Sequence, residues 1–530
     1  MFIDARAIPK NTAVETDVCI VGAGAAGITL TRELTGHSLS VCLLESGGLE
    51  YETETQSLAG GRSVGLSYPA LHTTRLRFFG GTTNHWNGTC RPLDDIDFQK
   101  RDWIPHSGWP FDRSELLPYY KRAQPIVQLG PFVYSDYDWH DVEKRQSIFD
   151  GSALTSAIFQ QSPPTRFGKT YQDEIERAPN VTTYLHANVL ELETNASGRT
   201  ITRARVTSLE RNDFYVSARI FILATGGIEN ARLLLLSNAK NRQGLGNDHG
   251  LVGRFFMDHP IVGDGNAGLI ALIAPTDFSR LLATRKEFDN FQPVGKADKP
   301  PRFWHCITPS AQEMRRAKLL NFGIGIELFD GPDVPGYASA RKLKRLLTKG
   351  EYLGDLWEII QDVISNIDDI VLTDKPDPLR VPLQVSYWAE PMPNPDSRVY
   401  LSNERDIFGQ PRIELDWRLT DLDKENFGHA LMLLGTELGR TGLGRLGANP
   451  EVWDEDWVKL VALSWHHMGT TRMHANPKSG VVDANCRVHG VSNLYVAGSS
   501  IFPTAGHATP TFTIVALALR LADHIKAKMG

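Results

Sequence analysis

Two features are scarce in this 530-residue chain: long apolar runs and cysteines. A membrane-spanning helix needs about 18 or more consecutive apolar residues, and the chain has no such run. Residues 1–16 lack the apolar core and the paired arginines of export signals. The five cysteines are too widely separated for a metal site or a redox pair: Cys19, Cys42, Cys90, Cys306 and Cys486. We therefore expect no membrane anchor, no bound metal and a reducing, cytoplasmic location.

An excess of basic charge is also missing. The 56 Lys and Arg residues stand against 62 Asp and Glu residues, which gives a formal net charge of −6. Nothing electrostatic therefore favours nucleic acid or an anionic membrane as a partner. With 41% hydrophobic and 22% charged residues, the composition is that of a globular protein with a large core. The length allows two to four domains, or one domain with a large insertion.

A glycine-rich turn dominates the first fifty residues. An apolar strand leads into Gly22-Ala23-Gly24-Ala25-Ala26-Gly27, a helix is predicted over 25–34, and a second strand ends at Glu45. In such a unit the first glycine allows the turn, the second lets a pyrophosphate approach, and the third lets helix and strand pack closely. A carboxylate about 20 residues later can accept hydrogen bonds from ribose hydroxyls. This pattern predicts an adenine dinucleotide site.

Two further turns are rich in glycine and hydroxyl residues. Gly80-Gly81-Thr82-Thr83, followed by Asn84-His85-Trp86-Asn87, offers backbone N–H groups and hydroxyls that suit a phosphate. A strand over 219–223 runs into Ala224-Thr225-Gly226-Gly227 and a leucine-rich helix. Such a turn at the carboxyl edge of a parallel sheet is a typical ligand site, although Gly226 and Gly227 could serve close packing alone.

The middle third changes pattern, and the last third becomes dense again. Residues 381–390 and 398–401 alternate like antiparallel strands with a turn at 391–396, and 352–370 has the pattern of an amphipathic helix. Earlier in the chain, 118–124 is predicted as a short helix between two prolines. Near the C-terminus, Ser464 to Met473 contains adjacent His466 and His467, a strand covers 494–496, and a final helix starts at Pro510.

In their order, these segments resemble the glucose–methanol–choline flavin oxidoreductases from about Asp17 to Ile525. Residues 254–260 and 393–399 are similar to a bacterial branch with pyranose oxidases, glycoside 3-oxidases and gluconate or fructose dehydrogenases. The resemblance implies FAD and an α/β fold, with a Rossmann-like FAD-binding domain and a second α+β substrate domain carrying an antiparallel sheet. We expect FAD-binding segments at 1–105, 171–263 and 461–530, a crossover and substrate region at 106–170, and a substrate-binding domain at 264–460.

The resemblance also assigns roles to residues. The catalytic base falls on His466, since a neutral imidazole can take the hydroxyl proton during hydride transfer. Relatives place Asn or His where this chain has Thr509, so the second catalytic group is either Thr509 or His507. The expected FAD-binding residues are Gly22, Gly24, Ala26, Gly27, Glu45, Gly80, Gly81, Thr82, His85, Trp86, Asn87, Val189, Ala224, Thr225, Gly498, Ser499, Thr509 and Pro510. A covalent flavin bond through His85 is the less favoured alternative, because Asn84 replaces the threonine of the covalent relatives.

The sequence therefore predicts an FAD-dependent enzyme that oxidises the CH–OH group of a sugar, glycoside or related alcohol to a ketone or aldehyde. The electron acceptor is left open between dioxygen, a quinone and a protein carrier, so oxidase and dehydrogenase both remain. Two alternatives are a lyase-like, non-redox enzyme on the same fold and the oxidation of a non-sugar alcohol in a biosynthetic pathway. A flavoprotein subunit without turnover of its own is a further possibility, against which His466 argues.

Overall fold

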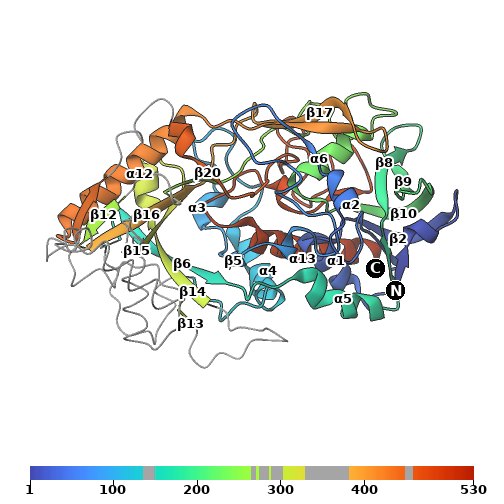
Figure 1. Ribbon diagram of the computed structural model, residues 1–530, viewed down its shortest axis with the longest axis horizontal. Coiled ribbons are helices and arrows are strands. Elements are labelled where there is room, and N and C mark those ends of the chain that lie inside the picture. Colours follow the sequence, from blue (N-terminus) through green and yellow to red (C-terminus); the bar gives the residue numbers. More distant parts are fainter. Residues whose placement is uncertain are drawn as a thin grey trace, which may run out of the picture.

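A computed structural model describes residues 1–134, 149, 151–263, 270–273, 286–287, 302–328, 381–447 and 457–530. Within these residues the strands form three sheets. Figure 1 shows the largely parallel sheet with its helices on the right, the antiparallel sheet on the left, and a small sheet along the top. The predicted helix at 352–370 lies outside the described residues.

The first sheet has eight strands and a mostly parallel core. Its order is β1–β7–β3–β2–β10–β9–β8, with β21 also paired to β10. Strands β1, β7, β3, β2, β10 and β21 run parallel, and β8 and β9 add an antiparallel edge. The bounds are β1 Phe2–Asp4, β2 Ala13–Val21, β3 Val41–Leu44, β7 Val181–Leu185, β8 Asn188–Thr194, β9 Ile201–Thr207, β10 Phe214–Leu223 and β21 Leu494–Val496. All eight strands come from the three predicted FAD-binding segments.

Four helices pack against one another beside this sheet: α1 (Ala25–Leu34), α4 (Arg113–Ile126), α5 (Phe167–Arg177) and α13 (Pro510–Met529). Helices α1 and α5 contact its strands directly. In Figure 1, α13 lies beside α1 although the two are separated by almost the whole chain. Helix α6 (Gly226–Leu236) packs against β8. Helices α1 and α13 begin at the residues that the glycine motif and the Thr509-Pro510 pair predict.

The predicted short helix between two prolines is wrong in its bounds, because α4 extends through Pro118 and Pro125. Its buried face packs on α13, where the Tyr120 hydroxyl lies 2.8 Å from Thr513 Oγ1. Burial of this face outweighs the hydrogen bonds that the two proline nitrogens cannot donate.

The second sheet has ten strands and is antiparallel, as expected for the substrate domain. Its order is β19–β12–β16–β15–β14–β6–β5, with β11, β13 and β20 attached at its sides. The bounds are β5 Thr89–Cys90, β6 Leu154–Gln161, β11 Pro260–Val262, β12 Ile270–Ile273, β13 Lys286–Glu287, β14 Arg302–Pro309, β15 Phe322–Leu328, β16 Val381–Ala389, β19 Gly444–Gly447 and β20 Ala462–Leu463. Helix α12 (Asp421–Arg440) covers it, and Phe322, Tyr387 and Phe427 share the core between them.

The third sheet is short, with the order β17–β18–β4 (β4 Gly61–Ser63, β17 Arg398–Arg405, β18 Pro411–Asp416). Residues 391–396 were predicted to turn between two paired strands. They instead lead from β16 in the second sheet to β17 in the third, because β17 pairs with β18. Short helices complete the described chain: α2 Thr53–Ser57, α3 Asp95–Phe98, α8 Ala311–Ala317, and the 3-10 turns η1 Ala5–Ala7, η2 Gly81–Asn84, η5 Trp457–Leu460 and η6 Ser499–Ile501.

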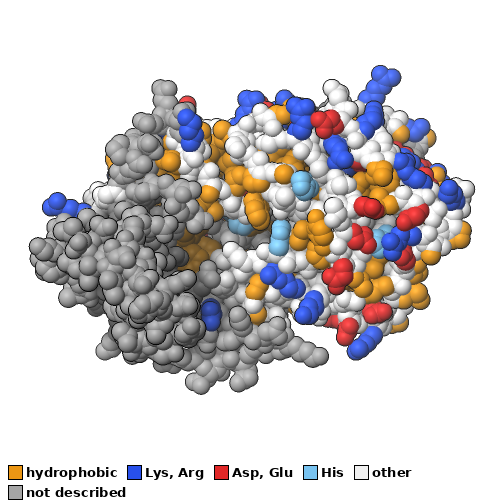
Figure 2. All heavy atoms as spheres, in the orientation of Figure 1, with side chains coloured by type: hydrophobic (Ala, Val, Ile, Leu, Met, Phe, Trp, Pro, Cys, Tyr) orange, Lys and Arg blue, Asp and Glu red, His pale blue; other side chains and the backbone are white. Residues whose placement is uncertain are grey.

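The surface agrees with the weak net charge. On the face in Figure 2, acidic and basic side chains are interspersed over the part that carries the parallel sheet. None of the helices in the described ranges combines the length and the apolar character that a membrane crossing requires.

Candidate active site

A cavity of about 470 Å³ lies at the carboxyl edge of the parallel sheet. The segments that follow β2, β3, β10 and β21 form its walls, together with the loop around His85 and the start of α13. It brings together most of the residues predicted to bind FAD or substrate: Gly22, Gly24, Ala26, Glu45, Gly81, Thr82, His85, Trp86, Asn87, Val189, Ala224, Thr225, His466, Gly498, Ser499, Thr509 and Pro510. Gly27, Gly80 and His507 do not line it.

The glycine turn is built for close approach. Gly22 has a φ of +101°, which favours glycine, and a Cβ at Gly27 would lie 1.9 Å from the carbonyl oxygen of Gly22. Gly27 therefore serves the packing of α1 on β2. A Cβ at Gly24 would meet no atom within 4 Å, so this glycine faces open space at the start of α1. The helix has no side-chain cap there, which leaves its first N–H groups available to an anion.

The Glu45 carboxylate braces this turn from the end of β3. One oxygen accepts from the Ala23 N–H at 2.9 Å and the other from the Gly47 N–H at 3.0 Å. Glu45 is almost fully buried and lines the cavity. The Ser46 hydroxyl also donates to Glu45 Oε1 at 3.1 Å. A carboxylate oxygen can accept two hydrogen bonds, so Glu45 Oε2 still has room for a ligand hydroxyl.

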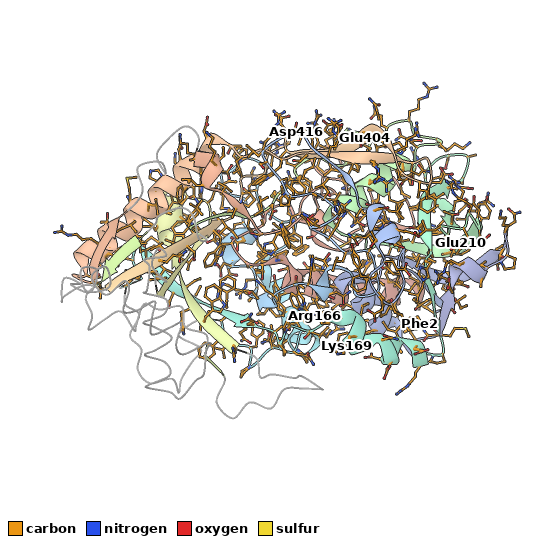
Figure 3. All side chains as sticks on the ribbon, in the orientation of Figure 1. Phe2, Arg166, Lys169, Glu210, Glu404 and Asp416 are labelled. Atoms are coloured by element: carbon orange, nitrogen blue, oxygen red, sulfur yellow. The ribbon has the colours of Figure 1, made fainter. Side chains whose placement is uncertain are left out.

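The loop at 80–87 is pinned from several sides. Gly80 donates its N–H to the Ala23 carbonyl at 2.8 Å, which joins this loop to the glycine turn. Arg166, labelled in Figure 3 beside α5, donates to the carbonyls of Thr83 and Trp86 at 2.9 and 2.7 Å. These bonds hold the His85 ring at the cavity wall.

The cavity wall fits FAD in charge and in polar groups. Three side-chain nitrogens at this wall are buried and have no hydrogen-bond partner in the described protein: Arg75 Nη1, Arg77 Nε and His85 Nε2. Arg75 and Arg77 share the carboxylate of Glu229 at 3.5 and 3.4 Å. Arg232 also contacts it at 2.7 Å and pairs with Asp406. Burial lowers the pKa of Arg75 to about 10. An anionic, polar ligand such as FAD would satisfy these groups.

His466 reaches the cavity from the segment that follows β20. Its backbone N–H donates to Asp258 Oδ1 at 2.8 Å, and the other Asp258 oxygen accepts from the Tyr68 hydroxyl at 2.5 Å. The preceding residue, Trp465, has a φ of +59°, an unusual value for a bulky side chain. Its side chain is exposed and lies against the His85 ring, with centroids 5.8 Å apart.

The electrostatic setting keeps the His466 ring neutral. Burial lowers the pKa of His466 well below its usual value, and the neighbouring His259 and His467 act in the same direction. The Nδ1 atoms of His466 and His259 lie 2.9 Å apart. No described protein group hydrogen-bonds His466 Nε2. A neutral ring with a free nitrogen at the wall of a cavity can accept a proton from a bound ligand.

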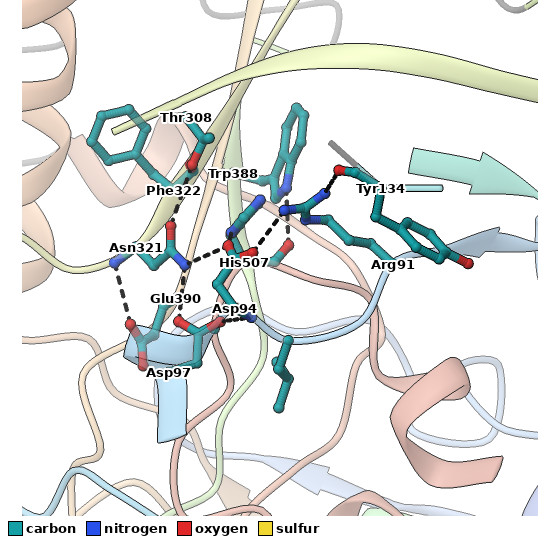
Figure 4. A network of polar contacts seen from close by, with 12 residues as sticks. Arg91, Asp94, Asp97, Tyr134, Thr308, Asn321, Phe322, Trp388, Glu390 and His507 are labelled. Carbon is teal, nitrogen blue, oxygen red and sulfur yellow. Dashed lines mark hydrogen bonds and ion pairs between the residues drawn. The ribbon is translucent and has the colours of Figure 1, made fainter. Parts of the chain in front are cut away.

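The two candidates for the second catalytic group lie in different surroundings. Thr509 lines the cavity, and its hydroxyl donates to the Thr89 carbonyl at 2.5 Å. His507 is fully buried behind the cavity, 3.7 Å from Asp94, in the polar network of Figure 4. Neither of its ring nitrogens has a hydrogen-bond partner in the described protein, and burial lowers its pKa to about 3. Only Thr509 faces the cavity in this structure.

Several residues of the site received no role from the sequence. Arg75 and Arg77 lie shortly before the turn at 80–83. They alternate with apolar residues, and this pattern could have indicated that both side chains lie on the same side of the loop. His259 lies in a segment noticed only for its resemblance to the bacterial branch. Trp465 gave no signal, because its backbone conformation depends on Asp258, more than 200 positions away.

Two protein-family models match the chain. Residues 17–243 match the FAD dependent oxidoreductase model, and residues 393–518 match the GMC oxidoreductase model. The first match covers the glycine turn and the 80–87 loop, and the second covers His466 and the start of α13.

The chain is also similar to characterised enzymes over nearly its full length. It is 24% identical to 2-methyl-1,2-propanediol dehydrogenase of Mycolicibacterium austroafricanum, over 98% of this chain and 97% of the relative. It is 22% identical to the fructose dehydrogenase large subunit of Gluconobacter japonicus, over 97% and 98%. Among solved structures, pyridoxine 4-oxidase from Mesorbium loti shares the fold, with a TM-score of 0.56 and 17% identity over 96% of this chain and 98% of that one.

Proposed function

The chain belongs to the GMC oxidoreductases, FAD-dependent enzymes that oxidise alcohols, and we propose that it oxidises a sugar, glycoside or related polyol with His466 as general base. The observation that carries the assignment is the His466 ring, neutral and with an unoccupied Nε2, at the wall of the cavity that starts at the dinucleotide-binding turn. Related enzymes named for a diol and for fructose support a polyhydroxylated substrate.

Different residues along the cavity would bind FAD and act on the substrate. Gly24, the start of α1 and Glu45 would hold the pyrophosphate and ribose of FAD, and Arg75 and Arg77 add positive charge at the wall. When bound, FAD supplies the hydride acceptor and passes the electrons to dioxygen, a quinone or another acceptor. His466 takes the hydroxyl proton of the substrate at Nε2. Thr509 lines the same space and offers lone pairs, because its own proton is bonded to Thr89.

His85 would hold the flavin without a covalent bond in this proposal.

The five cysteines are free and buried, which supports a location in a reducing compartment, and we propose the cytoplasm.

Anaerobic mixing tests the function. The purified FAD-loaded protein is mixed with D-fructose, D-glucose, methyl β-D-glucopyranoside and 2-methyl-1,2-propanediol, while flavin absorbance is followed. We expect at least one polyol to bleach the flavin. If none does, and no simple alcohol does either, the lyase-like alternative replaces the proposal.

Replacing His466 tests the base. We expect His466→Ala to retain FAD and to slow flavin reduction by about 10²- to 10⁴-fold, because a positioned base contributes that much. His249→Ala, which removes an exposed histidine, serves as the control. Reduction at the normal rate in His466→Ala would rule out this residue as the base.

A further inference from the structure

A second histidine stands behind His466, outside the cavity lining. His259 directly precedes β11 and is only 1% exposed. One of its nitrogens, Nδ1, lies 2.9 Å from His466 Nδ1, and the other, Nε2, lies 2.9 Å from the carbonyl oxygen of Gly506. The three groups therefore form a continuous row: carbonyl, imidazole, imidazole.

Counting protons in this row determines which nitrogen of His466 is bare. A carbonyl oxygen can only accept, so His259 Nε2 must carry a proton. A neutral imidazole has one N–H, so His259 Nδ1 is an acceptor. The proton between the two Nδ1 atoms then belongs to His466, and His466 Nε2 is left with a lone pair.

The row depends on His259 being neutral, and its surroundings favour that state. Burial lowers the pKa of His259 to about 4, although Glu390 and the Gly506 carbonyl act in the opposite direction. The only ring nitrogen partners of His259 in the described protein are the Gly506 carbonyl and His466. Among the residues that the structure describes, no carboxylate is hydrogen-bonded or ion-paired to the His259 ring.

We propose that His259 is a positioning residue that selects the tautomer of His466 needed for catalysis, which rests on the proposed role of His466 as base. When the alcohol is oxidised, its O–H bond breaks and the proton goes to His466 Nε2, while the C–H hydrogen leaves with its electron pair to the acceptor that FAD supplies. The His466 cation keeps its Nδ1 proton and, through it, donates a hydrogen bond to His259 Nδ1. No proton reaches His259.

Two amide substitutions separate the two hydrogen bonds of His259. In His259→Asn, the amide oxygen occupies the place of Nδ1 and can still accept from His466, but the bond to Gly506 is lost. In His259→Gln, the amide reaches the place of Nε2 and can still donate to Gly506, but the acceptor facing His466 is lost. A purely structural role would make the two variants equally damaging, or would favour Gln.

The measurement is the limiting rate of anaerobic flavin reduction with the best of the four polyols, normalised to bound FAD. We expect His259→Asn to stay within about tenfold of the wild type and His259→Gln to be slower by about 10²-fold, the lower range for a positioned base. Equal rates in the two variants, or a faster Gln variant, would overturn the inference. Full-speed reduction in His466→Ala would instead overturn the proposed function.

A measurement without substrate covers the case in which a variant does not fold. The unmodified FAD-loaded protein is labelled with ¹⁵N-histidine, and the His466 signals are assigned by their loss in His466→Ala. Bare and protonated ring nitrogens have well separated ¹⁵N shifts. A bare Nε2 supports the inference, and a protonated Nε2 contradicts it.

Discussion

At the scale of single residues, the low pKa of His466 predicts how activity depends on pH. Burial, followed by His259 and His467, lowers this pKa well below the usual 6.5. A base works in its neutral form, so activity is lost only when the pH falls through the lowered pKa. We expect the limiting rate of flavin reduction at pH 6 to equal that at pH 7.5. A half-maximal rate near pH 6.5 in stopped-flow measurements would contradict this.

Thr509 gives a second prediction at this scale. Its hydroxyl proton is directed to the Thr89 carbonyl, so the side chain cannot also donate to a substrate oxygen. The loss in Thr509→Val is then limited to one accepted hydrogen bond, about 0.5–1.5 kcal/mol, or roughly 2- to 12-fold in rate. Thr509→Ser keeps the hydroxyl and removes only the methyl group. Comparing its rate with that of Thr509→Val therefore separates the contributions of the two groups. A loss above 100-fold would show that Thr509 donates to the reacting oxygen.

Residues that lie close together in the sequence could be grouped from spacing, and residues with distant partners could not. Gly22, Gly24 and Glu45 lie within one strand–helix–strand unit, and all three line the same cavity. The environment of His259 is set by Gly506 and His466, each more than 200 positions away. No periodicity or spacing in a single sequence carries that information.

At the scale of elements, two glycines of the turn from β2 into α1 are expected to serve different purposes. Gly27 serves the packing of the helix, and Gly24 serves ligand binding. We expect Gly27→Ala to lower the melting temperature of the protein, because the new methyl group would lie 1.9 Å from the Gly22 carbonyl oxygen. Gly24→Ala has no such clash and should keep the fold while weakening FAD binding, since the methyl group projects into open space at the anion end of α1.

Melting curves and FAD titration of the apoprotein measure the two effects. Gly439→Ala, in α12 and with no atom within 4 Å of the new Cβ, is the matched control for an added methyl group. The assignment fails if Gly24→Ala binds FAD as tightly as the unmodified protein.

Elements with strong local signals were predicted well. The helix at 25–34 and the strand at 494–496 have the bounds that the apolar pattern predicts. The prolines of α4 led to wrong helix bounds, because packing on α13 outweighs their local effect on the helix. The alternation at 381–390 and 398–401 identified two strands, but alternation does not say which strand pairs with which.

At the scale of the whole molecule, a buried ion pair joins residues almost 300 positions apart, in the loop after α3 and at the end of β16. Arg101, in the loop after α3, donates two hydrogen bonds to Glu390 at the end of β16, at 2.7 and 2.5 Å. The two side chains are 1% and 0% exposed. We expect Glu390→Gln to destabilise the protein by about 3–5 kcal/mol, because it leaves a buried cation without its partner.

Thermal unfolding of the FAD-loaded protein provides the measurement. The exposed pair Arg62–Glu404, with side chains 59% and 53% exposed, is the control, and Glu404→Gln should change stability by at most about 1 kcal/mol. The double variant Arg101→Met with Glu390→Leu should recover part of the loss, since it removes both charges. Equal melting temperatures for Glu390→Gln and Glu404→Gln would contradict the expectation.

The position of the last strand and helix has a consequence for the order of biosynthesis. Strand β21 pairs with β10 in the middle of the parallel sheet, and α13 lies against α1. Residues 494–530 are synthesised long after the glycine turn at 22–27, with most of the two large sheets made in between. The cofactor cavity therefore stays incomplete during most of this synthesis, and flavin capture has to wait until residues 494–530 have left the ribosome.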